Sequence, residues 1–168
     1  MVIIMALPPG FVCCCAKCSC VIKRYLPGKS TYKRGCARKA GAFICADQYI
    51  LLVQSCGRFW GPPKGTVEDN ETIRDCAIRE VREETGLDVG AVLPQTYTKL
   101  KSRFYYYVVH MKQRRVFPLQ YPGNDVNGIG WFNIECVRRN IQDGSLQANQ
   151  HLRYGLELFF GLKNETPT

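Results

Sequence analysis

Three carboxylates stand close together in a segment whose spacing predicts a helix. Glu80, Glu83 and Glu84 follow the spacing i, i+3, i+4, so on a helix they share an arc of about 100°. Ile73 and Ala77 project into the same arc, which is therefore the face that turns toward the protein interior. A solvated acidic face should avoid such an apolar stripe. Crowded, partly buried carboxylates also repel one another and resist ionisation.

A bound divalent cation would relieve this repulsion. Oxygen ligands that leave room for water and phosphate oxygens suit Mg²⁺ or Mn²⁺. Such an ion neutralises a polyphosphate and lowers the pKa of a bound water. Arg79 can orient Glu83 or pair with Glu71 at the start of the helix, and Gly65 lets the backbone come close to the metal. The segment therefore predicts a metal site that serves a phosphate-rich substrate.

The elements that must position these residues are predicted from turn, strand and helix signals. The carboxylates lie on a helix over 71–85, with Asn70 as N-cap and Gly86 at its C-terminal end. The other expected elements are strands at 40–45, 49–54, 87–98, 103–111 and 129–134, loops at 57–65 and 121–127, and helices at 135–142 and 146–162. Strands interleaved with helices predict an α/β or α+β layered fold.

The length and composition are those of one ordinary globular domain. The chain has 168 residues, of which 46% are hydrophobic and 22% charged, which excludes collagen-like, coiled-coil and wholly disordered classes. We expect a domain over 36–168, preceded by a basic, Cys-rich extension over 1–35. No apolar run approaches the roughly 20 residues that a membrane span needs. The N-terminus also lacks the basic start of a signal peptide.

The net charge of +9 is concentrated in two segments. Residues 1–46 contain eight Lys or Arg and no Asp or Glu. A second acid-free window, between Asp88 and Asp125, contains Lys99, Lys101, Arg103, Lys112, Arg114 and Arg115. Any one of these residues is most simply a solvated surface charge. Two segments of the same sign nevertheless favour a polyphosphate or nucleic-acid ligand, with RNA backbone on the extension.

Ten cysteines occur, five of them in residues 13–20. Without a signal peptide, free thiols in a reducing compartment are expected, which predicts a cytoplasmic protein, with the nucleus as the alternative. Cys15 and Cys18 form a CxxC pair, but no second such pair or His pair follows at the usual zinc-site spacing. The role of the cluster is therefore left open between zinc, a lipid anchor and none.

The helical segment resembles the signature of the Nudix hydrolase superfamily. All nine fixed positions are filled, by Gly65, Glu71, Arg79, Glu80, Val81, Glu83, Glu84, Gly86 and Leu87. The resemblance covers residues 36–163. It implies a Nudix-type mixed sheet sandwiched between helices and a pyrophosphohydrolase that cleaves a nucleoside diphosphate linked to another group.

The resemblance also implies a role for each matching residue. Glu80 and Glu84 are the implied main metal ligands, and Glu83 is a further ligand or the base. The Gly65 carbonyl is the implied fourth ligand. Arg79 and Glu71 are the implied orienting pair.

The residues that flank the signature narrow the range of expected substrates. Residues 59–65 resemble the Trp-x-x-Pro-Lys-Gly lead-in of mRNA-decapping enzymes and of diadenosine tetraphosphate hydrolases. Residues 75–81 and 125–132 are more similar to the decapping group, in which an acidic residue occupies the position of Asp125. Asp125 is therefore a candidate general base or extra ligand, or alternatively a loop acid that caps a turn. We expect mRNA decapping, with capped RNA or another nucleotide as substrate.

Other functions are kept as alternatives. They are hydrolysis of a diadenosine polyphosphate, hydrolysis of a diphosphoinositol polyphosphate, and a non-catalytic RNA-binding Nudix module, which the intact carboxylate set disfavours. Cellular decapping enzymes carry a helical regulatory domain where this chain has its basic extension, so the architecture suits a stand-alone enzyme of a large DNA virus or a protist. The candidate substrate-binding residues are Arg58, Trp60, Lys64, Lys101, Arg103 and Tyr105.

Overall fold

The computed structural model describes residues 3–5, 7–23, 37–55, 58–114 and 126–162. Its strands are β1 (Ile3–Met5), β2 (Ser19–Lys23), β3 (Lys39–Ala46), β4 (Tyr49–Ser55), β5 (Phe59–Gly61), β6 (Lys64–Thr66), β7 (Thr98–Leu100), β8 (Phe104–His110) and β9 (Val126–Asn133). Its helices are α1 (Ile73–Thr85), α2 (Ile134–Gln142) and α3 (Gln150–Phe160).

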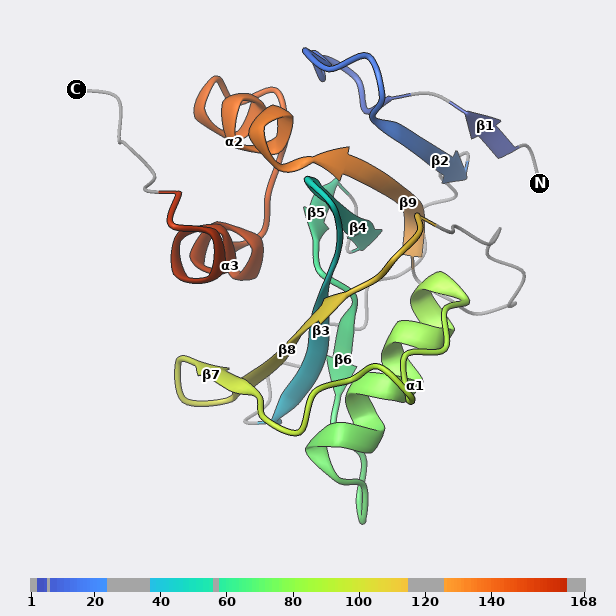
Figure 1. Ribbon diagram of the computed structural model, residues 1–168, viewed down its shortest axis with the longest axis vertical. Coiled ribbons are helices and arrows are strands. Elements are labelled where there is room, and N and C mark those ends of the chain that lie inside the picture. Colours follow the sequence, from blue (N-terminus) through green and yellow to red (C-terminus); the bar gives the residue numbers. More distant parts are fainter. Residues whose placement is uncertain (1–2, 6, 24–36, 56–57, 115–125, 163–168) are drawn as a thin grey trace.

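The strands form one mixed sheet in the order β1-β2-β9-β4-β3-β8-β7, while β5 pairs with β4 and β6 pairs with β3. β3 and β8 run parallel, from Lys39 opposite Phe104 to Cys45 opposite His110. The other pairs are antiparallel. α1 lies on one side of the sheet, and α2 and α3 lie on the other (Figure 1). The predicted sandwich of a mixed sheet between helices is thereby confirmed.

Successive side chains of the central strands point to opposite faces of the sheet, which divides the core into two layers. Ala42 and Ile44 of β3 belong to the layer that includes Ala77 and Val81 of α1. Phe43, between them, belongs to the opposite layer. That layer contains Ile50, Leu52, Trp60, Tyr106, Phe132, Val137, Leu152 and Leu156. Both faces of β3 and β4 are therefore buried, which explains why these strands read as nearly continuous apolar runs.

α1 is bounded by two specific caps. The Thr72 side chain accepts a 3.1 Å hydrogen bond from the Asp75 N–H, and Gly86 adopts a left-handed conformation (φ 76°) that suits glycine. The predicted C-terminal end is confirmed, but the predicted N-cap at Asn70 is wrong. Asn70 lies in the preceding turn with φ 65°, so the helix begins two residues later than expected.

The strand predicted over 87–98 is the largest error in the expected elements. Only residue 98 of that segment lies in a strand, β7, which continues to residue 100. The apolar residues of the segment are buried, namely Leu87, Val89 and Leu93. The chain turns between them, because Asp88 Oδ1 accepts a 2.9 Å hydrogen bond from the Gly90 N–H. The loop expected over 57–65 contains the short strands β5 and β6.

The N-terminal segment packs against the rest of the fold. β2 pairs with β9, from Ser19 opposite Trp131 to Ile22 opposite Gly128. Phe11 is buried, with its ring edge-on to Phe132 at 5.2 Å. The amide of Asn140 in α2 donates to the Val12 carbonyl and accepts from the Val12 N–H. Within the described ranges, no helix is both long and apolar enough to span a bilayer.

Candidate active site

The three carboxylates of α1 lie at graded depth beside β6. Glu84 is buried, at 7% exposure, and its Oε2 accepts a 2.8 Å hydrogen bond from the Lys64 N–H. The side chain of Glu80 is 13% exposed and that of Glu83 is 56% exposed. The predicted helical arc is therefore real, but it runs from the interior at Glu84 to solvent at Glu83.

Gly65 meets Glu80 across the gap between β6 and α1. A Cβ atom at Gly65 would lie 1.9 Å from the carboxyl carbon and from one oxygen of Glu80. The Cys76 thiol donates to the Gly65 carbonyl at 3.9 Å, so that carbonyl also faces α1. A glycine is required here because the carboxylate occupies the space of a side chain. The sequence predicted that Gly65 lets the backbone approach a metal ion; the structure shows that its close neighbour is the Glu80 carboxylate.

Arg79 connects the acidic residues. Its guanidinium makes a two-point contact with Glu71 at 2.8 and 2.9 Å, and it donates to Glu80 Oε1 at 2.7 Å and to Glu83 Oε2 at 3.2 Å. The Thr66 carbonyl accepts a further bond at 3.0 Å. The contacts to Glu71 and Glu83, which the sequence left as alternatives, are both present. The hydrogen bonds from Arg79 outweigh burial and lower the pKa of Glu71 to about 2.

The donor set suits a hard divalent cation. Carboxylate oxygens and the Gly65 carbonyl are ligands that Mg²⁺ and Mn²⁺ prefer, and they lie on the facing sides of β6 and α1. Their atoms do not converge on a single point. Throughout the described residues, the only set of three or more Asp, Glu, His or Cys ligand atoms within 4.8 Å of one another consists of thiols elsewhere in the fold.

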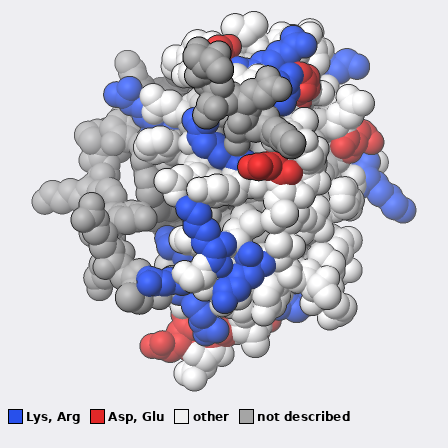
Figure 2. Space-filling model, turned by 90° about the vertical axis from the view of Figure 1, so that its left-hand side faces the viewer, with Lys and Arg blue, Asp and Glu red and all other residues white. Residues whose placement is uncertain are grey.

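A basic surface lies beside α3. Lys39, Lys64 and Lys101 all act on His151, the second residue of α3. Burial contributes most, and these three positive charges contribute further, to a pKa for His151 of about 4. Lys101 also places Nζ 4.3 Å from the centre of the Tyr154 ring. Figure 2 shows Lys and Arg side chains gathered on the lower part of this side of the molecule.

The sequence did not single out Lys39 or His151. Lys39 pairs with Thr66 and with Phe104 in the sheet, and the Phe104 ring stands 4.2 Å from the imidazole of His151. These neighbours come from distant parts of the chain, so only the topology brings them together. No local motif contained a signal for either residue.

Tyr106 was also missed. Its hydroxyl is the one buried side-chain oxygen or nitrogen without a hydrogen-bond partner within the described part of the chain. Burial, and then the nearby charge of Glu84, raise its pKa well above the usual value. Tyr106 belongs to the core layer on the side of the sheet opposite α1. It was overlooked because an aromatic residue in a strand is usually a core residue.

The predicted substrate-binding residues do not form one surface. Tyr105 packs against the α1 layer, edge-on to Tyr97 at 5.2 Å, whereas Lys101 lies beside α3 on the other side. Arg58 and Arg103 are exposed.

Trp60 is 1% exposed in the core, with its ring 5.1 Å from that of Phe132. This burial does not suit the substrate-binding role expected for Trp60. Asp125 lies outside the described residues.

Comparison with known proteins identifies the family of the chain. A family model described as the NUDIX domain matches residues 37–152. This chain belongs to the Nudix superfamily. The matched Nudix domain contains all nine signature positions and begins after β2, so the N-terminal strands and the cysteines of residues 13–20 lie outside it.

Relatives of the Nudix domain include viral and cellular proteins. Putative hydrolase 111R of Invertebrate iridescent virus 3 is 38% identical over 102 residues, which are 60% of this chain and 60% of the viral protein. The m7GpppN-mRNA hydrolase dcap-2 of Caenorhabditis elegans is 31% identical over 117 residues, which are 61% of this chain and 14% of that protein. Each match therefore spans less than two thirds of the relative.

A solved NUDIX hydrolase from Nitrosomonas europaea has the same fold. The TM-score is 0.57 at 20% sequence identity, and the match covers 74% of this chain and 88% of the other.

Proposed function

We propose that this Nudix protein is a divalent-metal-dependent pyrophosphohydrolase that removes the 5′ cap of mRNA. The observation that carries the reaction class is the placement of Glu80, Glu83 and Glu84 on the face of α1 that meets β6. The less exposed carboxylates of Glu80 and Glu84 can serve as ligands for an ion, and the more exposed carboxylate of Glu83 is accessible to water. No such combination would be needed by a purely RNA-binding module.

Each residue has a distinct part in the proposed reaction. Glu80, Glu84 and the Gly65 carbonyl would hold Mg²⁺ or Mn²⁺, with Glu83 as a further ligand. When bound, the ion would neutralise phosphate oxygens and lower the pKa of a water molecule. Glu83, the most exposed of the three, can accept the proton of the attacking water.

Arg79 would act as a positioning residue. Its contacts with Glu71, Glu80 and Glu83 hold three carboxylates at fixed distances. Asp125 is the second candidate base.

The substrate proposal rests on the basic surface beside the site. Lys64 belongs to both regions, since its N–H contacts Glu84 and its charge acts on His151 together with Lys39 and Lys101. A substrate with its reacting phosphates near Glu84 and a polyanionic tail along this surface would meet all three lysines. Capped RNA has that form. The named activity of the C. elegans relative is consistent with this choice.

The second candidate is a diadenosine polyphosphate hydrolase. It is favoured by residues 59–65, whose sequence suits both groups of enzymes. A dinucleotide is short and would meet Lys64 without extending along the rest of the basic surface. The two functions therefore differ in how strongly turnover depends on remote lysines and on salt.

A product assay with Mn²⁺ or Mg²⁺ tests the proposal. Its substrates are capped RNA, the isolated cap dinucleotide, diadenosine tetraphosphate, a diphosphoinositol polyphosphate and a nucleoside triphosphate. We expect kcat/KM to be highest for capped RNA, because remote binding energy can accelerate the reaction at the scissile bond. The advantage over the cap dinucleotide should shrink as salt rises. Equal turnover of diadenosine tetraphosphate at low salt would replace decapping by the second candidate.

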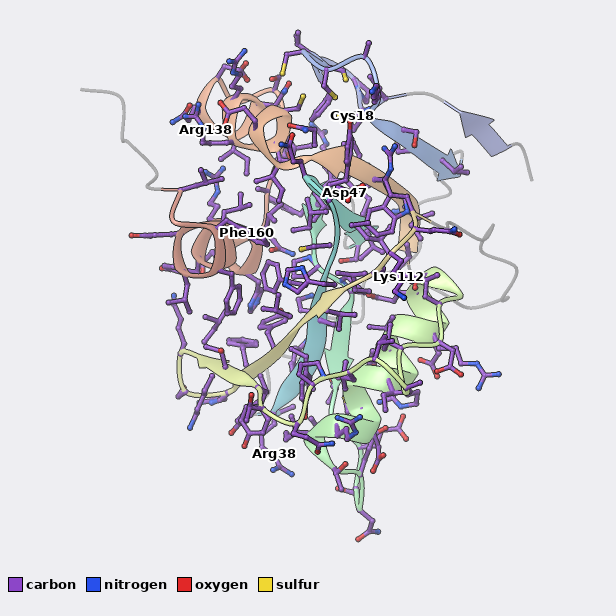
Figure 3. The ribbon with its side chains drawn as sticks, viewed as in Figure 1. Cys18, Arg38, Asp47, Lys112, Arg138 and Phe160 are labelled. Atoms are coloured by element: carbon purple, nitrogen blue, oxygen red, sulfur yellow. The ribbon has the colours of Figure 1, made fainter. Side chains whose placement is uncertain are left out.

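Two variants with the same change of charge test where the RNA chain binds on the protein surface. Lys101→Glu reverses a charge on the proposed surface and should lower kcat/KM for capped RNA several-fold at low salt, with little effect on the dinucleotide. Lys112 belongs to the same basic window of the sequence, but it lies beyond the opposite end of β8 (Figure 3) and not among the lysines that act on His151. Lys112→Glu therefore makes the same charge change away from the proposed surface and should leave the ratio of the two substrates unchanged. Equal effects of the two variants would contradict a localised path.

A further inference from the structure

Four thiols gather outside the Nudix match. Cys13, Cys15 and Cys18 come from the N-terminal segment, and Cys136 comes from the first turn of α2. The four sulfur atoms all lie within 4.8 Å of one another. Cys15 Sγ lies 3.6 Å from Cys13 Sγ and 3.7 Å from Cys18 Sγ. Figure 3 shows sulfur atoms near the labelled Cys18, between the N-terminal segment and α2.

We propose that Cys13, Cys15, Cys18 and Cys136 bind a structural Zn²⁺ ion. Zinc takes four thiolates at about 2.3 Å in tetrahedral geometry, which separates the sulfur atoms by about 3.8 Å. The two separations within the Cys13–Cys18 loop agree with this spacing. A set of four sulfur ligands selects a soft metal and rejects Mg²⁺. The site is therefore chemically distinct from the carboxylates of α1.

The surroundings of the cluster support a closed structural site. Cys136 is fully buried, and Cys13, Cys15 and Cys18 are half-buried. The Asn133 N–H donates to Cys18 Sγ at 3.2 Å, and the Tyr49 hydroxyl donates to Cys15 Sγ at 3.6 Å. Hydrogen bonds of this kind orient thiolate ligands and partly neutralise their charge.

The proposed ion would attach the N-terminal segment to the Nudix domain. The loop of Cys13 to Cys18 leads directly into β2, and Cys136 lies in the first turn of α2, the helix that follows β9, the partner of β2. A single ion would therefore join both sides of this strand pair near one end. Because the unfolded chain has no such site, zinc binding would add to the stability of the folded segment.

Cys14 is both a possible disulfide partner of Cys136 and a control for the zinc assignment. Its Sγ lies 3.0 Å from Cys136 Sγ, so a Cys14–Cys136 disulfide would compete for the proposed fourth ligand. Cys14 is exposed and does not belong to the group of four mutually close sulfurs. If zinc binds as proposed, Cys14 is dispensable for it.

Metal analysis of the 168-residue chain provides the first test. The protein is purified in reductant, dialysed against EDTA to remove weakly held ions, and analysed by mass spectrometry. We expect about one equivalent of Zn²⁺ per chain. Cys18→Ser and Cys136→Ser should lower zinc affinity at least tenfold, whereas Cys14→Ser and Cys45→Ala, which alters a buried cysteine of β3, should retain zinc. A Cys14→Ser variant that loses zinc as fully as Cys136→Ser would overturn the assignment.

Two measurements on the unaltered protein do not depend on whether variants fold. Co²⁺ replacing Zn²⁺ should give the charge-transfer and visible bands of tetrahedral thiolate coordination. Alkylation followed by peptide mapping should show Cys13, Cys15, Cys18 and Cys136 protected by zinc while Cys14 reacts. The absence of thiolate bands with added Co²⁺, a Cys14–Cys136 disulfide in the protein as purified, or an acylated cluster would each refute the proposal.

Discussion

The carboxylate of Glu80 occupies the space in which a side chain on Gly65 would stand. The separation of 1.9 Å between that carboxylate and an added Cβ is far inside any tolerated contact. Gly65→Ala should therefore displace Glu80 from β6, raise the Mn²⁺ concentration needed for half-maximal hydrolysis, and lower kcat at least tenfold. Gly90→Ala is the control, because an added Cβ there comes no nearer than 3.3 Å to a side-chain oxygen. Unchanged metal dependence in Gly65→Ala would contradict the proposed ligand set.

Glu84 is the most deeply placed of the three carboxylates, and its charge is central to the proposed reaction. Glu84→Gln keeps the shape of the side chain but removes the charge, so hydrolysis should fall by about two orders of magnitude while the fold survives. Steady-state kinetics with varied Mn²⁺, together with circular dichroism, would measure both effects. Glu157→Gln, on the exposed side of α3, should behave as wild type. Full activity in Glu84→Gln would rule out its assignment as a ligand.

Glu71 couples the acidic site to pH-dependent stability. The folded-state pKa of Glu71, about 2, lies below that of a free carboxyl group. The contribution of Glu71 to the free energy of unfolding is therefore present above about pH 4.5 and disappears as pH falls through about 2. Glu71→Gln should lower the free energy of unfolding at pH 7 by about 2–3 kcal/mol. Urea unfolding between pH 7 and pH 3 should show the difference from wild type shrinking at low pH.

The control for this effect is Glu68→Gln. Glu68 lies 4.0 Å from the same guanidinium, but its side chain is 70% exposed, compared with 12% for Glu71. Exposed ion pairs contribute little to stability, so this variant should unfold nearly as wild type does. Equal losses in the two variants would mean that burial of the Glu71–Arg79 pair is not the source of the stability.

Replacement of Tyr106 tests whether its buried hydroxyl lacks a hydrogen-bond partner. If its hydroxyl has no partner, Tyr106→Phe should raise the free energy of unfolding by about 1 kcal/mol, because the desolvation cost of the hydroxyl disappears. Tyr107→Phe is a neighbouring tyrosine control on the other face of β8. Thermal and urea unfolding would measure both. Destabilisation by Tyr106→Phe would instead reveal a bound water or another partner at this position.

Local signals predicted the parts of the structure that depend on adjacent residues. The 3.6-residue periodicity located α1, and Gly86 located its end, because helix geometry and left-handed caps are properties of a few neighbouring residues. Thr72 was missed as N-cap because Asn70 is an equally good capping type two residues earlier. The strands expected over 40–45 and 49–54 leave a short gap, and in the structure Asp47 turns the chain there with φ 51°.

Features that depend on distant pairing were not predictable in this way. β2 was hidden because its apolar residues follow a cysteine cluster and because its partner, β9, lies near the other end of the chain. Lys39 and His151 meet only after β3 pairs with β8 and α3 packs on the sheet. The fourth thiol of the cluster, Cys136, follows the CxxC pair at a separation that no zinc-binding pattern specifies.

The pairing of β2 with β9 determines how the protein can be shortened. A fragment limited to residues 37–162 would keep the Nudix match and all three helices but remove β2, the strand that pairs with β9. The backbone N–H and C=O groups along residues 128–131 would then become an open sheet edge, able to pair with another chain. Such a fragment would also lose the buried ring of Phe11. Its expected failure is strand-mediated aggregation rather than loss of the catalytic residues.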